Sequence, residues 1–594
     1  MNDIKRRYYE WYDRGVIFRS QINRLLFWIL LISLGLVIYQ ISFPKESVIH
    51  DRVNDLLRQI PRVLIPIYLY KWILPFLAPA KHGHPLAKDA SDLVFALGLF
   101  AFHVLKHSHW LLESEWFLYI ILALVASFKL MRESELLKST VLNPSLLLAG
   151  SFILLILIGT AILLIPGASY GNLSFIDALF LSTSAVCITG LASVDPGVAL
   201  TPLGHASLLV LIQLGGLGLM TFTNFFSYLF KGGMSFHNHM VMSNLIETNT
   251  PSSLASILLK IFVYTGLIEL LGALLIWWCT DWPGDADFLT SLFHSISAFC
   301  NAGFSTLEGG LYHPQVRFSY SLQLIISFLI ILGGIGFPVV IDMYDSLKRI
   351  FVANIWRDWG KKRGFISPAR YLTVHSRLVL TSTLVLLLLG MLVFFVAERN
   401  NVLKEHTTWT GKWVASFFGS VTPRTAGFAS FDVGSLMQGT VLAYLLLMWI
   451  GASPSSTGGG VKTTTFAIAF SNVIALARGK DRVELFRREI SSESIRRAFA
   501  VIFLSLIIIG LAIFLISLLE PHQSLTRIAF ECFSAYSTVG LSMNLTPELG
   551  TGSKYVLIVT MIIGRIGLFT FLVGVLQKSP AHAYRYPKEN VLII

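Results

Sequence analysis

Long apolar runs alternate with shorter ones along this 594-residue chain. Eight of the runs approach the roughly 20 residues that a helix needs to span a bilayer; they lie at 145–166, 204–230, 255–280, 318–343, 371–397, 437–452, 498–519 and 554–577. Four weaker runs precede them at 25–41, 62–79, 91–105 and 116–131, and the third of these is short enough to lie in the membrane interface instead. The pattern predicts a polytopic, all-α membrane protein.

Between alternate long runs lies an apolar run that is too short to cross a bilayer. These short runs occupy 175–188, 288–301, 412–425 and 525–538. Their length suits re-entrant half-helices, which persist at membrane depth only where protein or a water-filled cavity surrounds them. We therefore expect four units, each made of an outer helix, a half-helix, a turn and an inner helix.

A small-residue turn with a Gly follows each short run. The turns read Ile188-Thr189-Gly190-Leu191, Asn301-Ala302-Gly303-Phe304, Thr425-Ala426-Gly427-Phe428 and Thr538-Val539-Gly540-Leu541. A Phe stands ten residues before each Gly (Phe180, Phe293, Phe417, Phe530), and a candidate helix N-cap stands sixteen before it (Ser174, Asp287, Gly411, Ser524). A single Gly in an apolar helix is usually a packing residue, but four at matched offsets indicate an internal repeat.

The repeat predicts the domain organisation. We expect an N-terminal extension with up to four membrane helices at 1–142, pore repeats at 143–230, 255–343, 371–478 and 496–577, and a cytoplasmic tail at 578–594. Four such repeats in one chain can surround an axis as four identical subunits would. The expected fold is therefore a pseudo-fourfold arrangement of four helix–re-entrant loop–helix repeats, with extra N-terminal helices.

The four turns have the chemistry of a cation filter. The C-terminus of each half-helix carries about half a negative charge, which favours a cation at the centre. Gly adopts the φ values that let successive carbonyls face one way, and rings of carbonyls replace the hydration shell of K⁺. The predicted filter residues are Ile188, Thr189, Gly190, Asn301, Ala302, Gly303, Thr425, Ala426, Gly427, Thr538, Val539 and Gly540.

Acidic residues stand five positions after three of the four Gly residues. They are Asp195, Glu308 and Asp432, whereas Leu545 occupies this position in the last repeat. Carboxylates at an outer mouth would concentrate cations there. The alternative is that they are solvated loop residues.

The third inner run is interrupted. Apolar residues continue to Ile450, the stretch 451–465 is rich in Gly, Ser and Thr, and apolar residues resume at Phe466. A continuous helix would cost about 1 kcal/mol per Gly and about 3 per Pro, so we expect an unwound loop beside water. We predict a gate formed by Gly458, Gly459, Gly460, Lys462 and Thr463 together with Arg565 of the fourth inner run. Two alternatives stay open: the loop is only a kinked helix, and Arg565 is only a structural partner of a buried acid or carbonyls.

Other polar residues within the apolar runs suggest no further chemistry. His294 and Glu531 share the position nine residues before the turn Gly, and we expect structural roles for both. The same holds for Glu269, and Asp342 is expected at the membrane interface. The sequence Gly-Gly-Val-Lys-Thr is not a phosphate-binding loop, because Val461 separates Gly from Lys. Without a catalytic cluster of acids, His or Cys, we expect no enzyme and no cofactor in this chain.

Composition and charge fix the class and the orientation. Only 13% of the residues are charged and 54% are hydrophobic, whereas a soluble domain has about 25% charged residues. The net charge of +12 comes largely from short basic segments at the N-terminus, at 345–370 and at 478–497, which is typical of cytoplasmic loops and not of a nucleic-acid interface. Both termini are therefore expected in the cytoplasm. The four Cys residues have no disulfide or metal-site spacing.

From about 143 to 577 the chain resembles the Trk/Ktr/HKT superfamily of K⁺ transporters, in its bacterial TrkH/KtrB branch. The four turns carry the resemblance, together with Val421 to Phe428, Gly215-Gly216-Leu217-Gly218, Gly458 to Thr465 and Gly564-Arg565-Ile566-Gly567. A Gly in all four turns matches the K⁺-conducting pattern, whereas a Ser in the first turn marks Na⁺-preferring relatives.

The resemblance implies a K⁺-uptake subunit of the cell inner membrane. It implies K⁺ as the permeant ion bound at the filter residues, with Na⁺ as a second candidate, and surrounding membrane lipid. It also implies a homodimer and a cytosolic RCK-type nucleotide-binding ring as partner. The competing function is a secondary Na⁺- or H⁺-coupled transporter with alternating access, a class that shows two related halves rather than four quarters.

Overall fold

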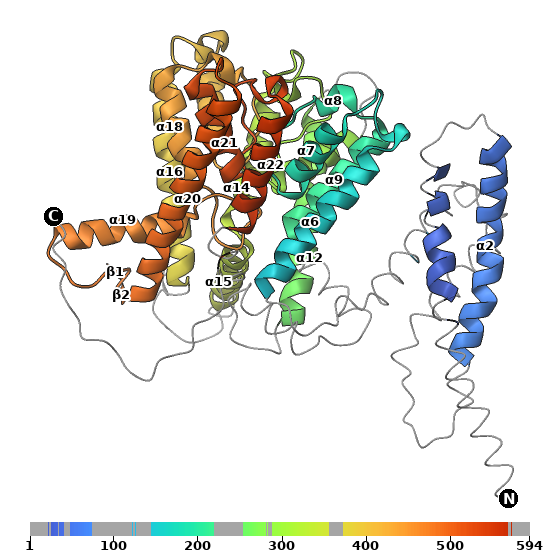
Figure 1. The fold of residues 1–594 in the computed structure, drawn as a ribbon. Helices are drawn as coiled ribbons and strands as arrows, with labels where there is room; N and C mark the ends of the chain where they lie inside the picture. Colours follow the sequence, from blue (N-terminus) through green and yellow to red (C-terminus); the bar gives the residue numbers. More distant parts are fainter. Residues whose placement is uncertain are drawn as a thin grey trace, which may run out of the picture.

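The computed structural model describes residues 48–73, 144–218, 254–280, 288–355 and 372–567, shorter stretches between 22 and 40, and residues 122, 125, 282 and 572. Within these residues the chain is mostly helical, with turns and loops between the helices and one short hairpin (Figure 1). The predicted C-terminal tail, most of the loop at 345–370 and the apolar runs at 91–105 and 116–131 lie largely or wholly outside the described residues. So does Asp287, one of the predicted helix caps.

The described part from residue 144 onward consists of four units of similar construction. The outer helices are α6 (Pro144–Leu163), α12 (Leu254–Cys279), α16 (Val374–Ala397) and α20 (Ser492–Leu519). The half-helices are α7 (Phe175–Val186), α13 (Phe288–Phe299), α17 (Trp409–Val421) and α21 (Leu525–Ser537). The inner helices are α9 (Pro202–Leu217), α14 (Tyr320–Ile335), α18 (Gln438–Trp449) and α22 (Thr551–Ile566). We call these sets units 1 to 4 in chain order.

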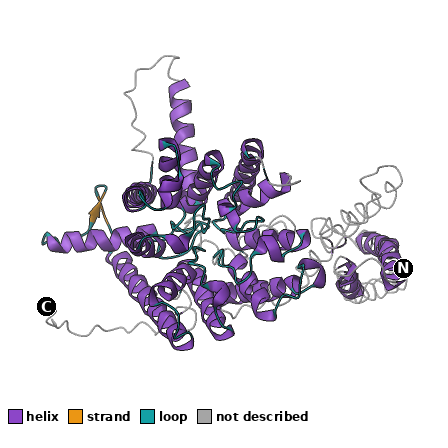
Figure 2. Cartoon of the chain, turned by 90° about the horizontal axis from the view of Figure 1, so that it is seen from above, coloured by secondary structure: helices purple, strands orange, loops and turns teal. Residues whose placement is uncertain are grey.

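The units pack in a cycle. Each inner helix contacts the half-helix of the next unit: α9 packs on α13, α14 on α17, α18 on α21, and α22 returns to α7. Seen from above, helices surround a group of loops near the middle (Figure 2). A partly buried ion pair of 2.8 Å between Lys554 Nζ and Asp177 Oδ1 joins unit 4 to unit 1 at the start of α7.

In units 1 to 3, a Ser of the half-helix binds the outer helix beside a Gly. Ser182 Oγ donates to Ile156 O, Ser295 Oγ to Glu269 O and Ser420 Oγ to Leu387 O, at 2.6–2.8 Å. The adjacent outer-helix Gly residues leave no room for a Cβ against these hydroxyls. Ser182 and Ser295 lie eight residues before the turn Gly, but Ser420 lies only seven before it.

Unit 3 therefore departs from the spacing that the sequence suggested. Phe418, not Phe417, takes the buried position of Phe180, Phe293 and Phe530: Phe418 is fully buried and Phe417 is only partly buried. The predicted N-cap Gly411 is also wrong, because α17 begins earlier, where the Thr408 hydroxyl accepts from Gly411 N at 3.1 Å. Ser174 caps α7 as predicted, with its hydroxyl accepting from Asp177 N.

The second inner run is broken as well as the third, whereas the sequence predicted an interruption in the third run and a continuous apolar span at 318–343. α14 ends at Gly336 (φ 95°), and α15 (Phe337–Ile355) leaves at an angle of 98°. Gly218 and Gly567 end α9 and α22 with φ values of 79° and 82°. The inner helices are consequently shorter than the apolar runs that predicted them.

Three described helices are long and apolar enough to cross a membrane, namely Leu259–Cys279, Val374–Ala397 and Ser492–Leu519; the bent pair α14–α15 counts as a fourth. Large apolar side chains on their outer faces are exposed, for example Leu388 and Phe503. Such faces suit contact with lipid.

Two segments extend from the four units. After the break in unit 3, α19 (Thr463–Ala477) contacts α16 and α20 and extends outward to a short hairpin, β1 (Glu484–Leu485) with β2 (Arg488–Glu489) (Figure 1). In both views α2 (Val48–Ile73) lies to one side of the four units (Figure 1, Figure 2). It packs with residues between 22 and 40 and with Leu122 and Val125 in a separate apolar cluster.

In units 3 and 4, a Glu at the end of the outer helix accepts hydrogen bonds from the start of the inner helix of the same unit. Glu398, fully buried at the end of α16, accepts from Met437 N at 3.0 Å and from the Thr440 hydroxyl. Glu520 at the end of α20 accepts from Gly550 N at 2.8 Å. Both carboxylates satisfy N–H groups that a helix start leaves without intrahelical partners.

Candidate functional site

The four Gly-containing turns have the same unusual backbone. The residue two before each Gly has a positive φ, which non-Gly residues seldom adopt, and so does the Gly itself. The φ values are 56° and 86° for Ile188 and Gly190, 60° and 71° for Asn301 and Gly303, 66° and 76° for Thr425 and Gly427, and 50° and 92° for Thr538 and Gly540. Four copies of one strained conformation indicate a shared functional geometry.

The turns touch one another in a cycle. A Cβ added to Gly190 would lie 2.5 Å from Ala302 O, one on Gly303 would lie 2.7 Å from Ala426 O, and one on Gly427 would lie 2.5 Å from Val539 O. A Cβ on Gly540 would strike Thr189 O, which closes the cycle. The carbonyl that precedes each Gly thus lies against the Gly of the neighbouring unit.

Hydrogen bonds to the half-helix ends support these turns. In units 1, 2 and 4 the residue before the Gly donates its N–H to a Ser carbonyl: Thr189 N to Ser184 O at 2.7 Å, Ala302 N to Ser297 O at 2.7 Å and Val539 N to Ser534 O at 2.9 Å. In unit 3, Ala426 N donates to Thr422 O at 3.1 Å, one residue nearer along the chain. The buried hydroxyls of Thr189, Thr425 and Thr538 have no hydrogen-bond partner among the described residues.

The predicted outer acids lie in loops that join neighbouring units. Asp195 caps α8 (Pro196–Ala199) and also accepts from Gly309 N of unit 2 at 2.8 Å. Asp432 accepts from Gly434 N at 3.0 Å and from Asn544 Nδ2 of unit 4 at 3.3 Å. Glu308 is exposed. Two of the three carboxylates therefore also serve to hold loop backbone and side chains together.

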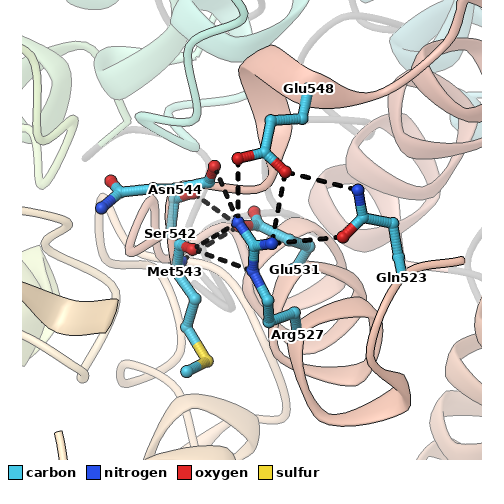
Figure 3. Close-up of polar contacts among 7 residues, drawn as sticks. All are labelled: Gln523, Arg527, Glu531, Ser542, Met543, Asn544 and Glu548. Atoms are coloured by element: carbon cyan, nitrogen blue, oxygen red, sulfur yellow. Dashed lines mark hydrogen bonds and ion pairs between the residues drawn. The ribbon is translucent and has the colours of Figure 1, made fainter. Parts of the chain in front are cut away.

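An ion pair that the sequence did not predict joins α21 of unit 4 to the segment after its turn. Arg527 Nη1 lies 3.2 Å from Glu548 Oε2, and Arg527 also donates to the carbonyls of Met543 and Asn544 (Figure 3). This contact lowers the pKa of the Glu548 carboxyl. The separation of 21 residues between Arg527 and Glu548 matched no repeat offset, so the sequence gave no signal for the pair.

The break in the third inner helix is a loop that packs against the turns of units 3 and 4. Ile450 and Val461 form an isolated parallel bridge, and Ala452 N donates to Gly459 O at 3.2 Å. A Cβ on Gly458 would strike the hydroxyl of Thr425, and a Cβ on Gly459 would strike the hydroxyl of Thr538. The predicted gate residues and the predicted filter residues are thus in direct contact.

Other units hold the loop in place. Thr457 N donates to Gly333 O at 3.3 Å and Ser453 N to Gly334 O at 3.0 Å, both carbonyls belonging to α14. Arg565 of α22 donates to Thr457 O at 2.5 Å and to Gly215 O of α9 at 2.8 Å. Arg565 therefore links the loop to two inner helices.

The remaining gate residues lie within the loop or at its end. Lys462 Nζ donates to Gly458 O at 2.8 Å, so its charge is turned back onto the loop. Gly460 has a φ of 70°, and Thr463 begins α19 with its N–H bonded to Ala452 O at 3.2 Å. Among the described residues no group of three or more His, Cys, Asp or Glu could hold a metal ion.

A family model described as a cation transport protein, TrkH, matches residues 115–585. The chain belongs to the TrkH family. It is therefore a multi-pass membrane protein that transports cations and not an enzyme. The match begins nearer the N-terminus than the resemblance at 143–577 had suggested.

Curated relatives cover the same part of this TrkH-family chain. It is 38% identical to the Ktr system potassium uptake protein B of Bacillus subtilis, over 78% of this chain and 99% of the relative. It is 35% identical to the potassium/sodium uptake protein NtpJ of Enterococcus hirae, over 76% and 97%. The solved potassium transporter TrkH of Vibrio parahaemolyticus has a TM-score of 0.59 at 15% identity, covering 88% and 98% of the two chains, which shows a shared fold alone.

Proposed function

We propose that this protein takes up K⁺ through a channel-like pathway, with the four turns forming a carbonyl filter and the loop 450–462 forming an intramembrane gate. The fold proposed is a pseudo-fourfold ring of four units with re-entrant half-helices. The cyclic contact between each turn Gly and the next unit's carbonyl carries the proposal, because a filter requires backbone carbonyls around one axis. The relatives named for potassium uptake agree with it.

The proposed geometry favours a cation in three ways. All four half-helices end at the turns, and each contributes its negative dipole end there. The buried hydroxyls of Thr189, Thr425 and Thr538 add oxygen atoms that form no hydrogen bond with any described residue. An inside-negative potential of 100 mV supplies about 2.3 kcal/mol per charge, or roughly fiftyfold accumulation, so K⁺ uptake needs no nucleotide site in this chain.

Purified protein in K⁺-loaded liposomes tests this function. We expect K⁺ flux down an imposed gradient, with no movement of H⁺ or Na⁺ in fixed ratio to it, and a Na⁺ flux at least about tenfold smaller. Because one relative is named for both potassium and sodium, the same vesicles should be assayed with Na⁺ alone. Flux that requires a coupled Na⁺ or H⁺ gradient would favour the secondary-transporter alternative.

The location and the assembly are also proposals. We place the protein in the cell inner membrane with both termini in the cytoplasm, because the basic segments would then obey the positive-inside rule. The exposed arginines of the hairpin, Arg487 and Arg488, would belong to this inner face. We propose a homodimer and a cytosolic RCK-type ring docked on the inner face.

Charge reversal on the hairpin tests the docking face. The double variant Arg487→Glu/Arg488→Glu should weaken co-purification of the ring severalfold, and the effect should shrink at high salt because exposed charges are screened. Pull-down of the ring at low and high ionic strength measures this. Glu484→Arg on the same hairpin is the control, because it adds positive charge where the double variant removes it, and it should not weaken co-purification. Equal co-purification by all variants would contradict the docking face.

A further inference from the structure

The half-helices of units 2 and 4 hold their turns in a way that units 1 and 3 do not. At the position nine residues before the turn Gly, units 2 and 4 carry His294 and Glu531, both fully buried. At the position two residues after the Gly, the same two units carry Ser305 and Ser542. In each unit the polar side chain and the Ser are bonded across the turn.

In unit 4, the Glu531 side chain on α21 binds the segment that follows the turn Gly. Its Oε1 accepts from Ser542 Oγ at 2.5 Å and from Met543 N at 3.1 Å (Figure 3). Its Oε2 accepts from Thr546 Oγ1 at 2.8 Å. Arg527, one helical turn earlier on α21, donates to Met543 O at 3.2 Å. The segment directly after Gly540 is thus bonded to α21 through side chains.

In unit 2, His294 makes the corresponding contact. Its Nδ1 lies 2.8 Å from Thr290 O, which can only accept, so Nδ1 carries the proton. The other nitrogen, Nε2, then accepts from Ser305 Oγ at 2.8 Å. Ser305 Oγ in turn accepts from Leu307 N at 3.0 Å. As in unit 4, the Ser hydroxyl donates to an acceptor on the half-helix.

Units 1 and 3 lack these groups. In unit 1 the two positions are Leu181 and Ala192. In unit 3, with its one-residue shift, they are Gly419 and Ala429, and the Phe394 ring lies 3.0 Å from where a Gly419 Cβ would be. Since the units contact one another in the order 1, 2, 3, 4, the two polar pairs belong to units that face each other across the ring.

We infer that Glu531 and His294 are positioning residues, which keep the outer half of the filter in register through Ser542 and Ser305. This inference rests on the proposed function. A turn with positive φ at two of three residues is strained and needs support to keep its carbonyls on the ion. Buried hydrogen bonds to fixed helix side chains provide that support, and losing one leaves a buried polar group unpaired. Specificity between K⁺ and Na⁺ is therefore set partly from behind the filter.

Selectivity of variants in proteoliposomes tests the inference. Glu531→Leu, which removes both acceptor oxygens, should lower the K⁺/Na⁺ permeability ratio by about tenfold. Ser542→Ala should lower it by about threefold, and the double variant should fall no further than Glu531→Leu. Glu531→Gln keeps an oxygen for Ser542 and Met543, so its ratio should stay within about twofold of the parent. His294→Leu should act in the same direction.

Glu398→Gln and Glu398→Leu are the matched controls, because this buried carboxylate also accepts from a backbone N–H and a hydroxyl but binds no turn residue. They should change the amount of folded protein and leave the permeability ratio unaltered. If Glu531→Leu does not fold, the K⁺/Na⁺ permeability ratio of Ser542→Ala tests the inference instead. If Ser542→Ala and every folded Glu531 and His294 variant have the permeability ratio of the parent, the inference is wrong. The proposed function would still stand in that case, provided that the parent conducts K⁺. Absence of K⁺ flux in the parent would overturn the proposed function itself.

Discussion

Gly427→Ala and Gly540→Ala are each expected to reduce K⁺ flux at least about tenfold. The φ values of 76° and 92° lie in the left-handed region, which costs a residue with a Cβ roughly 1–2 kcal/mol. The added methyl would also meet a carbonyl of the next unit, since a Cβ on Gly427 lies 2.5 Å from Val539 O. Relief of that contact must move a carbonyl that the proposed filter offers to the ion. Initial K⁺ flux per folded protein in liposomes measures the loss.

Gly190→Ser should change selectivity as well as flux. Its Cβ would lie 2.5 Å from Ala302 O, a contact like that of Gly427, so the carbonyl ring would be distorted, and we expect a shift of preference from K⁺ toward Na⁺ in the flux that remains. The permeability ratio from paired K⁺ and Na⁺ gradients detects it. Gly510→Ala on α20, where no atom lies within 4 Å of the added Cβ, should behave as the parent. Unchanged ratios in folded variants at all four turns would remove the filter assignment.

The recurrence of a short helix and a Gly-containing turn could be predicted from the sequence because its requirements are local. A half-helix of fixed length and a Gly of positive φ must recur wherever the turn recurs, so matched offsets predicted both. Counting residues back from the turn Gly gives the wrong position where the turn between the half-helix and the Gly is one residue shorter than in the other units. In unit 3 the bond from Ala426 N reaches Thr422 O instead of a residue one further back, and the buried Phe is shifted by one residue with it. The N-cap differs for a separate reason, because α17 begins three residues earlier than predicted, at the Thr408 cap.

The sequence around Gly336 does contain residues that predict a helix end, but they lie within an apolar run that suggests a continuous span. Gly333, Gly334 and Gly336 precede Pro338, a combination that commonly ends a helix, but the surrounding run is apolar on both sides. Hydropathy reports burial in lipid or protein and not the direction of the backbone. The 98° bend follows from the left-handed φ of Gly336, which no hydropathy window can register.

Contacts between units could not be predicted from one sequence. Asp195 and Gly309 are 114 residues apart, and Arg565 and Gly215 are 350 apart. The sequence around an acidic loop residue is the same whether its carboxylate attracts ions or accepts a hydrogen bond from a neighbouring loop. Only the packing of the four units distinguishes these roles.

Arg565→Ala is expected to raise partner-independent K⁺ flux about tenfold or more. Arg565 donates to Thr457 O of the loop and to Gly215 O of α9, and hydrogen bonds from a charged group contribute about 1.5–3 kcal/mol each. Losing the bond to the loop removes stability only from the state in which the loop packs against the filter. A gain of about 1.4 kcal/mol for the open state is already tenfold in population.

Deletion of Gly458–Gly460 should act in the same direction. These residues let the loop approach the hydroxyls of Thr425 and Thr538 more closely than any side chain would permit. A shortened loop cannot reach that position. Gly458→Ala is a milder variant, because its methyl would push the loop away from Thr425 without changing the chain length. Flux of the variants without any cytosolic partner is the measurement.

Two controls separate a gate from a kinked helix. Arg482→Ala removes an exposed hairpin arginine whose side chain is 72% exposed, and it should leave flux unchanged. The K⁺/Na⁺ ratio should remain that of the parent in all gate variants, since the turns themselves are intact. A kinked helix with a purely structural arginine would instead give Arg565→Ala protein that is less stable and no faster. If the Arg565 and loop variants fold, reach the membrane and conduct no faster than the parent, the loop is not the gate.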